Sequence, residues 1–387
     1  MLINSFDFQP RTRLLYGTGV VDQVGVLARE LEGRHVLLVT DPGIVRAGHA
    51  QRVIDSLKGA GLVVEVFDRV FENPTVSLVQ DCAEMANEHP VDLIIGLGGG
   101  SSLDTARGCN FVCTNGGTMR DYHGTGKASR PMLPMIAIPT TAGTGSECQS
   151  FALISDDETH VKMACGDPKA AARAAILDPT LTLSQPPHVT ACTGIDAIAH
   201  AVESAVSRKR NALSFLYSKE AFVLTQAALP QVIENPEDLS ARGAMLLGAS
   251  YAGIAIENSM LGAAHATANP LTANYDVIHG QAVGVMLPHV VRYNLQNPDA
   301  RETYRQLALA AGLTAPTDSA ERACERFVRR LHDILSLLPL KQSLSDLNVA
   351  PENLPQLAKE AADQWTGKFN PEPVNEESLQ HIYSAAV

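Results

Sequence analysis

The sequence predicts an α/β domain built on a parallel sheet, followed by an all-helical domain. Three observations carry this prediction. The chain has 387 residues, more than one ordinary hydrophobic core organises. Its first half alternates short apolar runs with helical patterns, which is typical of parallel strands joined by right-handed crossover helices. After the turn-rich segment 183–188, the second half has helical periodicity and few strand signals.

Strands of the first domain are predicted from short apolar runs that end at polar or glycine-rich turns. Runs of this kind occupy residues 35–41, 62–67, 92–97 and 134–138. Helical patterns occupy residues 47–59 and 77–88, and a further helix begins at Ser101 or Ser102. This alternation predicts a Rossmann-like nucleotide-binding domain over residues 1–185.

Helical periodicity dominates the second domain, which we place at residues 186–387. Helices are expected at residues 190–207, 212–234, 239–268, 281–294, 304–311, 320–335 and 353–364. With an α/β half and an all-α half, the default position for a ligand is the crevice between them.

Composition excludes several classes of function. A formal net charge of -12 argues against nucleic-acid binding, which needs clustered basic residues. The seven cysteines form no CxxC pair, which favours reduced thiols and argues against a cysteine-built zinc site. The N-terminus has no signal-peptide pattern, and no apolar stretch is expected to reach membrane-spanning length. We therefore expect a cytoplasmic protein without a nucleic-acid or membrane partner.

A glycine-rich loop follows the third predicted strand, in the sequence DLIIGLGGGSSLDTAR at residues 92–107. Gly98, Gly99 and Gly100 allow close approach to the backbone, and the helix that follows offers N–H groups and a positive dipole end. This combination suits a pyrophosphate. A tight turn, with Ser101 only capping the helix, is the alternative.

A second polar loop, PTTAGTGSE at residues 139–147, also follows a strand. Its hydroxyl groups on Thr140, Thr141, Thr144 and Ser146 suit a polar face of a cofactor, although a threonine-rich turn that caps a helix has the same composition.

Two charged residues are candidates for contacts with a cofactor ribose. Asp41 ends the first predicted strand, where a carboxylate accepts hydrogen bonds from an adenosine ribose and repels a 2′-phosphate. It therefore favours NAD over NADP, and an Asx turn before Pro42 is the alternative. Lys162 lies beyond the threonine-rich loop and is either a ribose contact or a solvent-exposed lysine.

A candidate metal site combines one carboxylate with three imidazoles. In GIDAIAHAVE at residues 194–203, Asp196 and His200 are four residues apart and share one helix face. With His265 and His279 they make a four-ligand set for a divalent first-row metal. A structural hydrogen bond between Asp196 and His200 is the alternative.

Four motifs, in this order and spacing, resemble the iron-containing (group III) alcohol dehydrogenases: GGGSSLD, PTTAGTGSE, GIDAIAHAVE and LGAAHATANPL…HGQAVGVMLPHV. The resemblance covers nearly the whole chain, to the C-terminal NPEPV. Within the family, the sequence is similar to the lactaldehyde reductase and short-chain alcohol dehydrogenase branch. It implies a dehydroquinate synthase-like architecture and a metal-dependent NAD(H) oxidoreductase. Such an enzyme interconverts small primary alcohols or diols with aldehydes by hydride transfer. A homodimer or higher homo-oligomer is expected.

The resemblance also implies site residues. The metal, Fe²⁺ or alternatively Zn²⁺, would be held by Asp196, His200, His265 and His279. Cofactor contacts would come from Asp41, Asn73, Gly98, Gly99, Ser101, Asp104, Thr140, Thr141, Thr144, Lys162 and Leu181. The substrate pocket would lie near Phe151, Ile256, Asn269 and Phe369.

Two positions depart from the family pattern. Asn269 stands where relatives commonly carry a second histidine, four residues after His265, and Val283 stands where they commonly carry asparagine. Asparagine cannot titrate, so the proton path differs from one that uses histidine. The alternative for Asn269 is a helix cap before Pro270.

Rival functions on this scaffold are a polyol dehydrogenase, a metal- and NAD-dependent lyase, and a non-catalytic assembly protein. A phosphorylated lyase substrate would need extra basic residues, and a binding protein would not need an oriented metal. Oxidation of alcohols with NAD discriminates among these.

Overall fold

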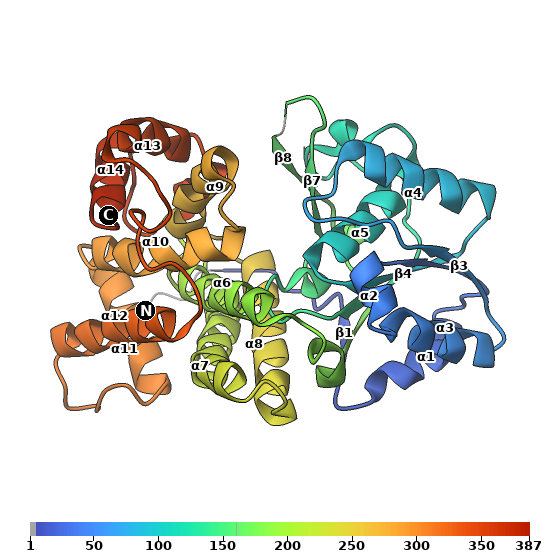
Figure 1. The fold of residues 1–387 in the computed structure, drawn as a ribbon, viewed down its shortest axis with the longest axis horizontal. Coiled ribbons are helices and arrows are strands. Elements are labelled where there is room, and N and C mark those ends of the chain that lie inside the picture. The colour runs from blue at the N-terminus through green and yellow to red at the C-terminus, as the bar shows by residue number, and fades with distance from the viewer. Residues whose placement is uncertain (1–4, 160) are drawn as a thin grey trace. The chain divides into compact units, whose positions relative to one another are not determined.

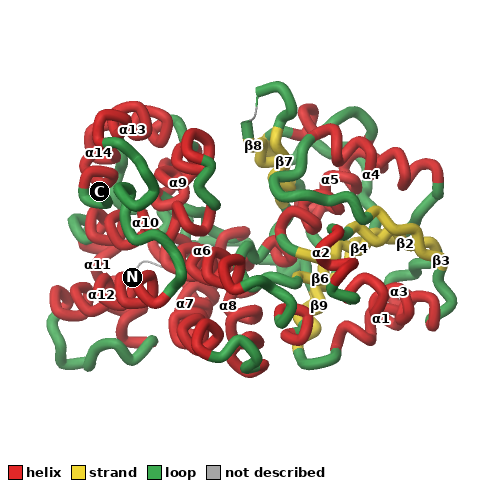
Figure 2. The backbone as a smooth tube through the Cα atoms, in the orientation of Figure 1, coloured by secondary structure: helices red, strands yellow, loops and turns green. Residues whose placement is uncertain are grey.

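The computed structural model describes residues 5–159 and 161–387, which form two compact units (Figures 1 and 2). An α/β unit contains Gln9–Thr141 and Gly145–Ser184. A helical unit contains Gln185–Val387 together with Ala142–Thr144 and the described residues 5–8. The threonine-rich loop is thus divided between the two units.

The α/β unit is built on a six-stranded sheet in the order β1-β9-β6-β4-β2-β3. Every pair of neighbouring strands is parallel. The strands are β1 (Arg13–Tyr16), β2 (His35–Val39), β3 (Val63–Phe67), β4 (Leu93–Gly98), β6 (Met135–Pro139) and β9 (Ala174–Leu177). Four of them correspond to predicted strands. The sequence did not predict β1 and β9, because runs of four residues are too short to show a period.

Helices cover both faces of this sheet, which explains the continuous apolar runs of its central strands. Leu93, Ile95 and Leu97 of β4 share a core with residues of α1 and α3. On the other face Gly96 leaves room for α5, because an added Cβ would lie 3.0 Å from a methyl carbon of Leu103. The helices are α1 (Val24–Glu30), α2 (Pro42–Arg46), α3 (His49–Gly59), α4 (Val76–Glu88) and α5 (Gly100–Asn115).

A second sheet of three strands lies in the same unit, in the order β5-β8-β7. Its strands are β5 (Gly124–Thr125), β7 (Phe151–Ser155) and β8 (Lys162–Gly166). The antiparallel pairing of β7 with β8 places Phe151 opposite Gly166 and Ser155 opposite Lys162. Sequence analysis did not predict this sheet, since its strands are short and lack a clear alternation.

The helical unit contains only helices and loops between Pro187 and Val387. Its α-helices are α6 (Pro187–Val206), α7 (Ala212–Glu234), α8 (Leu239–Glu257), α9 (Ala263–Tyr275), α10 (His279–Asn294), α11 (Pro298–Ala310), α12 (Ala320–Leu337), α13 (Leu354–Ala362) and α14 (Glu376–Ser384). The prediction of an all-helical second half is therefore correct, although α14 was not predicted.

The predicted single helix over residues 239–268 is wrong, because two helices, α8 and α9, occupy this region. Asn258 ends α8, and its side-chain Nδ2 donates to the carbonyl of Ile254 at 2.8 Å. Met260 then has a φ of 146°, which no helix tolerates. The break places His265 in the first turn of a new helix.

Helix α8 also corrects the expectation that no apolar stretch has membrane-spanning length. By length and composition alone it is long and apolar enough to cross a membrane, but 67% of its most apolar window is buried inside the protein. Its close packing on α7 accounts for this burial, since a Cβ added at Gly248 would lie 2.6 Å from Cγ2 of Thr225. Burial of this kind is typical of a core helix.

Candidate metal centre and cofactor loops

The candidate metal centre lies in the helical unit, around the carboxylate of Asp196 on α6. Oδ1 of Asp196 lies 3.5 Å from Nε2 of His200, one turn along the same helix. It lies 3.4 Å from Nε2 of His265 on α9 and 4.0 Å from Nε2 of His279 on α10. Three helices thus bring three imidazoles to one carboxylate oxygen.

The donor atoms of this cluster are arranged for a cation. Asp196, His265 and His279 each place one donor atom within 4.8 Å of the others. Oδ1 of Asp196 and Nε2 of His265 are buried and have no hydrogen-bond partner. Leaving such groups unsatisfied is costly, and a bound cation would satisfy both. His200 lies beside this group, with its ring stacked on that of His265 at 4.9 Å.

Electrostatics in the cluster favour positive charge, which in the metal-free protein is a proton on His265. Burial lowers the pKa of His265, but the charges of Glu203 and Asp196 outweigh burial and raise that pKa to about 10. Burial raises the pKa of Asp196, yet the neighbouring histidines hold it well below its ordinary value. A carboxylate with imidazoles is a donor set that suits Fe²⁺ and Zn²⁺, so the residues fit such a metal.

Glu203 is a residue of the site that sequence analysis missed. Its Oε2 makes a short hydrogen bond with Nδ1 of His265, on the side of the ring opposite Asp196. Carboxylates in this position commonly fix the tautomer and orientation of a metal-binding histidine. A signal was present in GIDAIAHAVE, because Glu203 follows Asp196 by seven residues and lies on the same helix face.

The two departures from the family pattern have different surroundings. Asn269 lies inside α9, which continues to Tyr275, so its interpretation as a helix cap is wrong. Its Nδ2 donates to Oε1 of Gln364 at 2.8 Å. Val283 is fully buried inside α10, where it only packs.

In the α/β unit, the glycine-rich loop joins β4 to α5. Gly98 has a φ of 146°, and a Cβ there would lie 2.4 Å from Oγ of Ser102. Gly99 is the N-cap of α5, and no side chain caps this helix. The alternative in which Ser101 caps the helix is therefore wrong. A helix N-terminus directly behind glycines is an anion-binding arrangement.

Asp41 lies beside this loop and caps α2. Its Oδ1 accepts hydrogen bonds from the backbone N–H groups of Gly43 at 2.8 Å and Ile44 at 3.0 Å. Its Oδ2 accepts a hydrogen bond from Oγ of Ser102 at 3.3 Å. The capping alternative is thus observed, and the negative charge is held next to the glycines as the cofactor interpretation requires.

Asp104 was predicted to contact the cofactor, but its carboxylate is buried and engaged by the protein. Oδ1 accepts from Nη1 of Arg107 at 3.0 Å and from Oγ of Ser146 at 2.8 Å, and Oδ2 accepts from the N–H of Leu153 at 3.2 Å. Burial outweighs the charge of Arg107 and raises the pKa of Asp104. In this structure its carboxylate connects segments inside the α/β unit.

Arg107, which sequence analysis also missed, is fully buried and links several segments of the α/β unit. Besides Asp104 it donates to the carbonyls of Ser146 at 2.7 Å, Phe151 at 2.5 Å and Ala170 at 3.2 Å. The helix behind the glycine loop is thereby connected to the end of the threonine-rich loop and to β7.

The remaining cofactor candidates are dispersed. Nζ of Lys162 lies 3.3 Å from Oδ1 of Asn73, and both side chains are exposed. Thr140 is buried, and Thr141 lies beside Gly99. Thr144 groups with the helical unit. Leu181 has no exposed surface and belongs to the core, so it offers no contact to a ligand here.

The predicted substrate-pocket residues belong to different units. Phe151 lies in the α/β unit, where its ring packs against Gly166. Ile256 is buried near the end of α8. Phe369 ends a 3₁₀ helix (Trp365–Phe369), and Nζ of Lys209 lies 4.7 Å from the centre of its ring.

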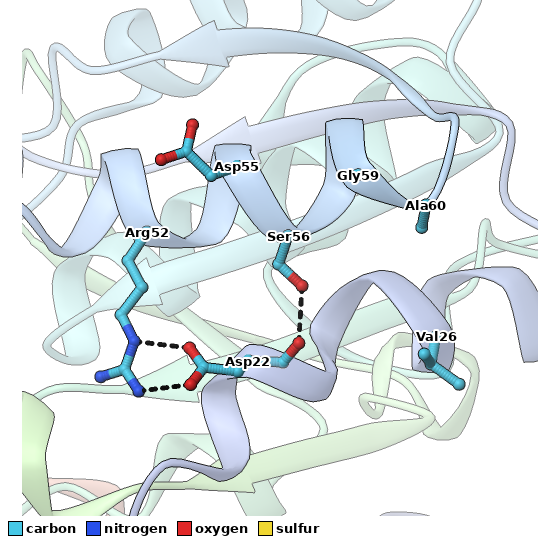
Figure 3. A pocket seen from close by; sticks show the side chains of 7 residues that line it. All are labelled: Asp22, Val26, Arg52, Asp55, Ser56, Gly59 and Ala60. Carbon is cyan, nitrogen blue, oxygen red and sulfur yellow. Dashed lines mark hydrogen bonds and ion pairs between the residues drawn. The ribbon is translucent and has the colours of Figure 1, made fainter.

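A separate surface pocket of the α/β unit contains none of the predicted site residues (Figure 3). Two of its charged groups are paired with each other, since Arg52 contacts both carboxylate oxygens of Asp22, at 2.6 and 2.9 Å. The pocket is lined by Asp22, Val26, Arg52, Asp55, Ser56, Gly59 and Ala60.

Comparisons with known proteins cover the whole length of the chain. A family profile described as "Iron-containing alcohol dehydrogenase" matches residues 10–179, and one described as "Fe-containing alcohol dehydrogenase family, C-terminal" matches residues 190–387. A choline dehydrogenase of Bacillus subtilis is 35% identical over 379 residues, covering 97% of this chain and 94% of that protein. An NAD-dependent methanol dehydrogenase of Bacillus methanolicus is 31% identical over 371 residues, covering 96% and 97%.

A solved structure of a 1,3-propanediol oxidoreductase superposes with a TM-score of 0.95 at 31% identity, covering 99% of this chain and 100% of that one. The predicted architecture, a parallel-sheet α/β part and an all-helical part, is thereby confirmed.

Proposed function

The chain belongs to the iron-containing alcohol dehydrogenase family, and from that premise we propose that it interconverts small primary alcohols or diols with aldehydes, using NAD(H) and a divalent metal. The observation that carries the proposal is the cluster of Asp196 with three histidines, in which Oδ1 of Asp196 and Nε2 of His265 are buried without a hydrogen-bond partner. The names of the relatives, which include alcohol and diol dehydrogenases, support the same class of substrate.

In this proposal Asp196, His200, His265 and His279 hold Fe²⁺ or Zn²⁺ in the helical domain, residues 186–387. When bound, the metal supplies Lewis-acid stabilisation of negative charge on the alcohol oxygen, and the nicotinamide exchanges the hydride. Glu203 supports the role of His265, since a hydrogen bond at Nδ1 leaves Nε2 as the donor atom. Because Asn269 cannot titrate, the alcohol proton leaves by water, the cofactor ribose or another group.

The α/β domain, residues 1–185, is proposed to bind NAD. The uncapped start of α5 behind Gly98 and Gly99 suits the pyrophosphate, and Asp41 suits the adenosine ribose. Thr140, Thr141 and Lys162 complete the proposed contacts. We also propose a cytoplasmic location and a homo-oligomeric assembly, for which the supporting observations are the reduced-cysteine pattern and the family resemblance.

The experiment that tests the function is an absorbance assay for NADH with the metal-loaded protein and a panel of primary alcohols, diols and polyols. Oxidation of small alcohols is expected. Preference for a long polyol would favour the polyol dehydrogenase, and conversion of substrate without net change in NADH would favour the lyase.

Replacing Asp41 with asparagine should narrow the preference for NADH over NADPH. Asparagine keeps the oxygen that caps α2 but removes the charge that repels a 2′-phosphate. The ratio of kcat/KM for the two cofactors measures the effect. Asp55→Asn, an exposed position on α3, is the matched control and should leave the ratio unchanged. If the unmodified enzyme used NADPH better, the ribose role of Asp41 would be wrong.

Replacing Asn269 with histidine should change the pH dependence of alcohol oxidation more than the affinity for NADH. Residue 269 lies one helical turn after His265, where a histidine can exchange protons near the working pH. The pH–rate profile measures the effect, and Asn274→His, an exposed position on the same helix, is its control. A profile of Asn269→His that overlays the parent would defeat the relay idea.

A further inference from the structure

The first turn of α9, which carries His265, is held by two side chains from distant parts of the chain. The N-cap of this helix is Gly262, which has no side chain to cap it. Instead, Oε1 of Glu203 accepts from the N–H of Ala264 at 2.7 Å, and Oδ1 of Asn370 accepts from the N–H of Ala263 at 3.3 Å. These partners satisfy N–H groups that every helix start leaves without an intrahelical acceptor.

Asn370 is itself fixed by a reciprocal amide pair. Its Nδ2 donates to Oδ1 of Asn294 on α10 at 2.6 Å, and Nδ2 of Asn294 donates back to Oδ1 of Asn370 at 3.2 Å. Both residues are buried, and Nδ2 of Asn294 also donates to the hydroxyl of Tyr304 at 3.1 Å. Asn370 therefore has one orientation in which its carbonyl oxygen reaches α9.

Position 262 must remain without a side chain for both partners to approach. A Cβ added at Gly262 would lie 3.0 Å from Oδ1 of Asn370 and 3.1 Å from Oε1 of Glu203. Both contacts are shorter than ordinary van der Waals contacts, so one partner or the helix start would have to move. Three independent features thus meet at the start of α9.

We propose that Glu203, Asn370 and Gly262 form a clamp that positions His265 for the metal, and that the NPEPV segment at residues 370–374 thereby controls how tightly the metal is held. The inference rests on the proposed metal site. Glu203 and Asn370 are positioning residues, because they act through His265. Oε1 of Glu203 holds the helix start while its Oε2 holds the ring.

The energetic reason is the narrow tolerance of metal bonds. Ligand distances vary by only about 0.2 Å, so a small shift of the helix start weakens the bond that Nε2 of His265 makes. Loss of a group that orients a metal ligand typically costs about 10–100-fold in metal affinity. The clamp variants should show a loss of this size.

The test compares the parent with Asn370→Ala, Gly262→Ala and a matched control, Tyr293→Phe. The control removes only the hydroxyl that donates to the carbonyl of Pro373 at 2.7 Å, a hydrogen bond to the same segment in which no residue of α9 takes part. Each protein is loaded with Zn²⁺, and release to a chelator is timed. Release should be about 10–100-fold faster in both clamp variants than in the control. NADH binding should stay unchanged, which excludes general unfolding.

Hydrogen exchange of the Ala263, Ala264 and His265 amides in metal-free protein gives a second measurement. These amides should exchange faster in the clamp variants than in Tyr293→Phe. If Asn370→Ala does not fold, Gly262→Ala alone tests the clamp, since this variant keeps every hydrogen-bond donor and acceptor at the start of α9. Release and exchange rates in Gly262→Ala within twofold of the control would overturn the clamp. A parent that holds no Zn²⁺ or Fe²⁺ would overturn the proposed metal function instead, while the exchange rates still decide the clamp.

Discussion

Replacing Asp196 with alanine should abolish metal binding and reduce alcohol oxidation by about a thousandfold or more. Oδ1 of Asp196 is the atom that faces all three imidazoles, and it supplies the only negative charge in the predicted ligand set. Without the metal, the transition state loses several kcal/mol of Lewis-acid stabilisation, so the activation barrier rises. Each 1.4 kcal/mol added to the barrier slows the reaction about tenfold.

Metal analysis by mass spectrometry and the NADH assay together measure this effect. His265→Ala should behave like Asp196→Ala, because Nε2 of His265 faces Oδ1 of Asp196 at 3.4 Å and is also buried without a hydrogen-bond partner. His188→Ala is the matched control, since it removes an exposed histidine from the same helix as Asp196. Full metal content in either site variant would remove that residue from the ligand set.

Replacing Arg107 with methionine should destabilise the protein by about 3–5 kcal/mol, the usual cost of leaving a buried charge without its partner. Asp104 would lose the guanidinium at 3.0 Å, and the carbonyls of Ser146, Phe151 and Ala170 would lose their donor. Urea denaturation of both proteins measures the change in the free energy of unfolding. Arg13→Met, which breaks an exposed ion pair with Glu30, should cost at most about 1 kcal/mol.

The loss in Arg107→Met should become smaller as the pH falls. Burial already raises the pKa of Asp104, and removal of Arg107 raises it further. A carboxyl whose folded pKa exceeds its unfolded value binds protons more tightly when folded, so stability returns on acidification through the folded pKa. Asp104→Asn in the same protein should restore part of the stability at neutral pH. A double variant no more stable than Arg107→Met would refute this account of the pair.

The central strands were predictable because both faces of the sheet are covered, so that β2, β4 and β6 read as continuous apolar runs. The edge strand β1 and the hairpin of β7 and β8 gave no such signal. The error at residues 239–268 has a similar cause. Alanine-rich helical periodicity runs through the break. The start of the second helix is held by Asn370 and Glu203, which lie 107 and 61 residues away from the N–H groups of Ala263 and Ala264 that they bind.

For the site, local spacing was sufficient only for Asp196 and His200, which share one helix. His265 and His279 were candidates by residue type alone, and no local spacing ties them to Asp196, since they lie on other helices. Glu203, Arg107 and Asn370 were missed, because each acts through partners far away in the sequence. Asp104, a residue of the glycine-loop motif, makes hydrogen bonds inside the fold that the motif alone did not indicate.

The clamp also has a consequence for the order of events during biosynthesis. Asn370 is translated 107 residues after Ala263, and its Oδ1 accepts a hydrogen bond from the N–H of Ala263. At about 5–20 residues per second, His265 waits on the order of ten seconds after its synthesis before its helix start is complete. The α/β unit ends at Ser184 and is synthesised before that moment. The nascent protein therefore acquires its proposed cofactor-binding surface early and the proposed clamp on its metal site last.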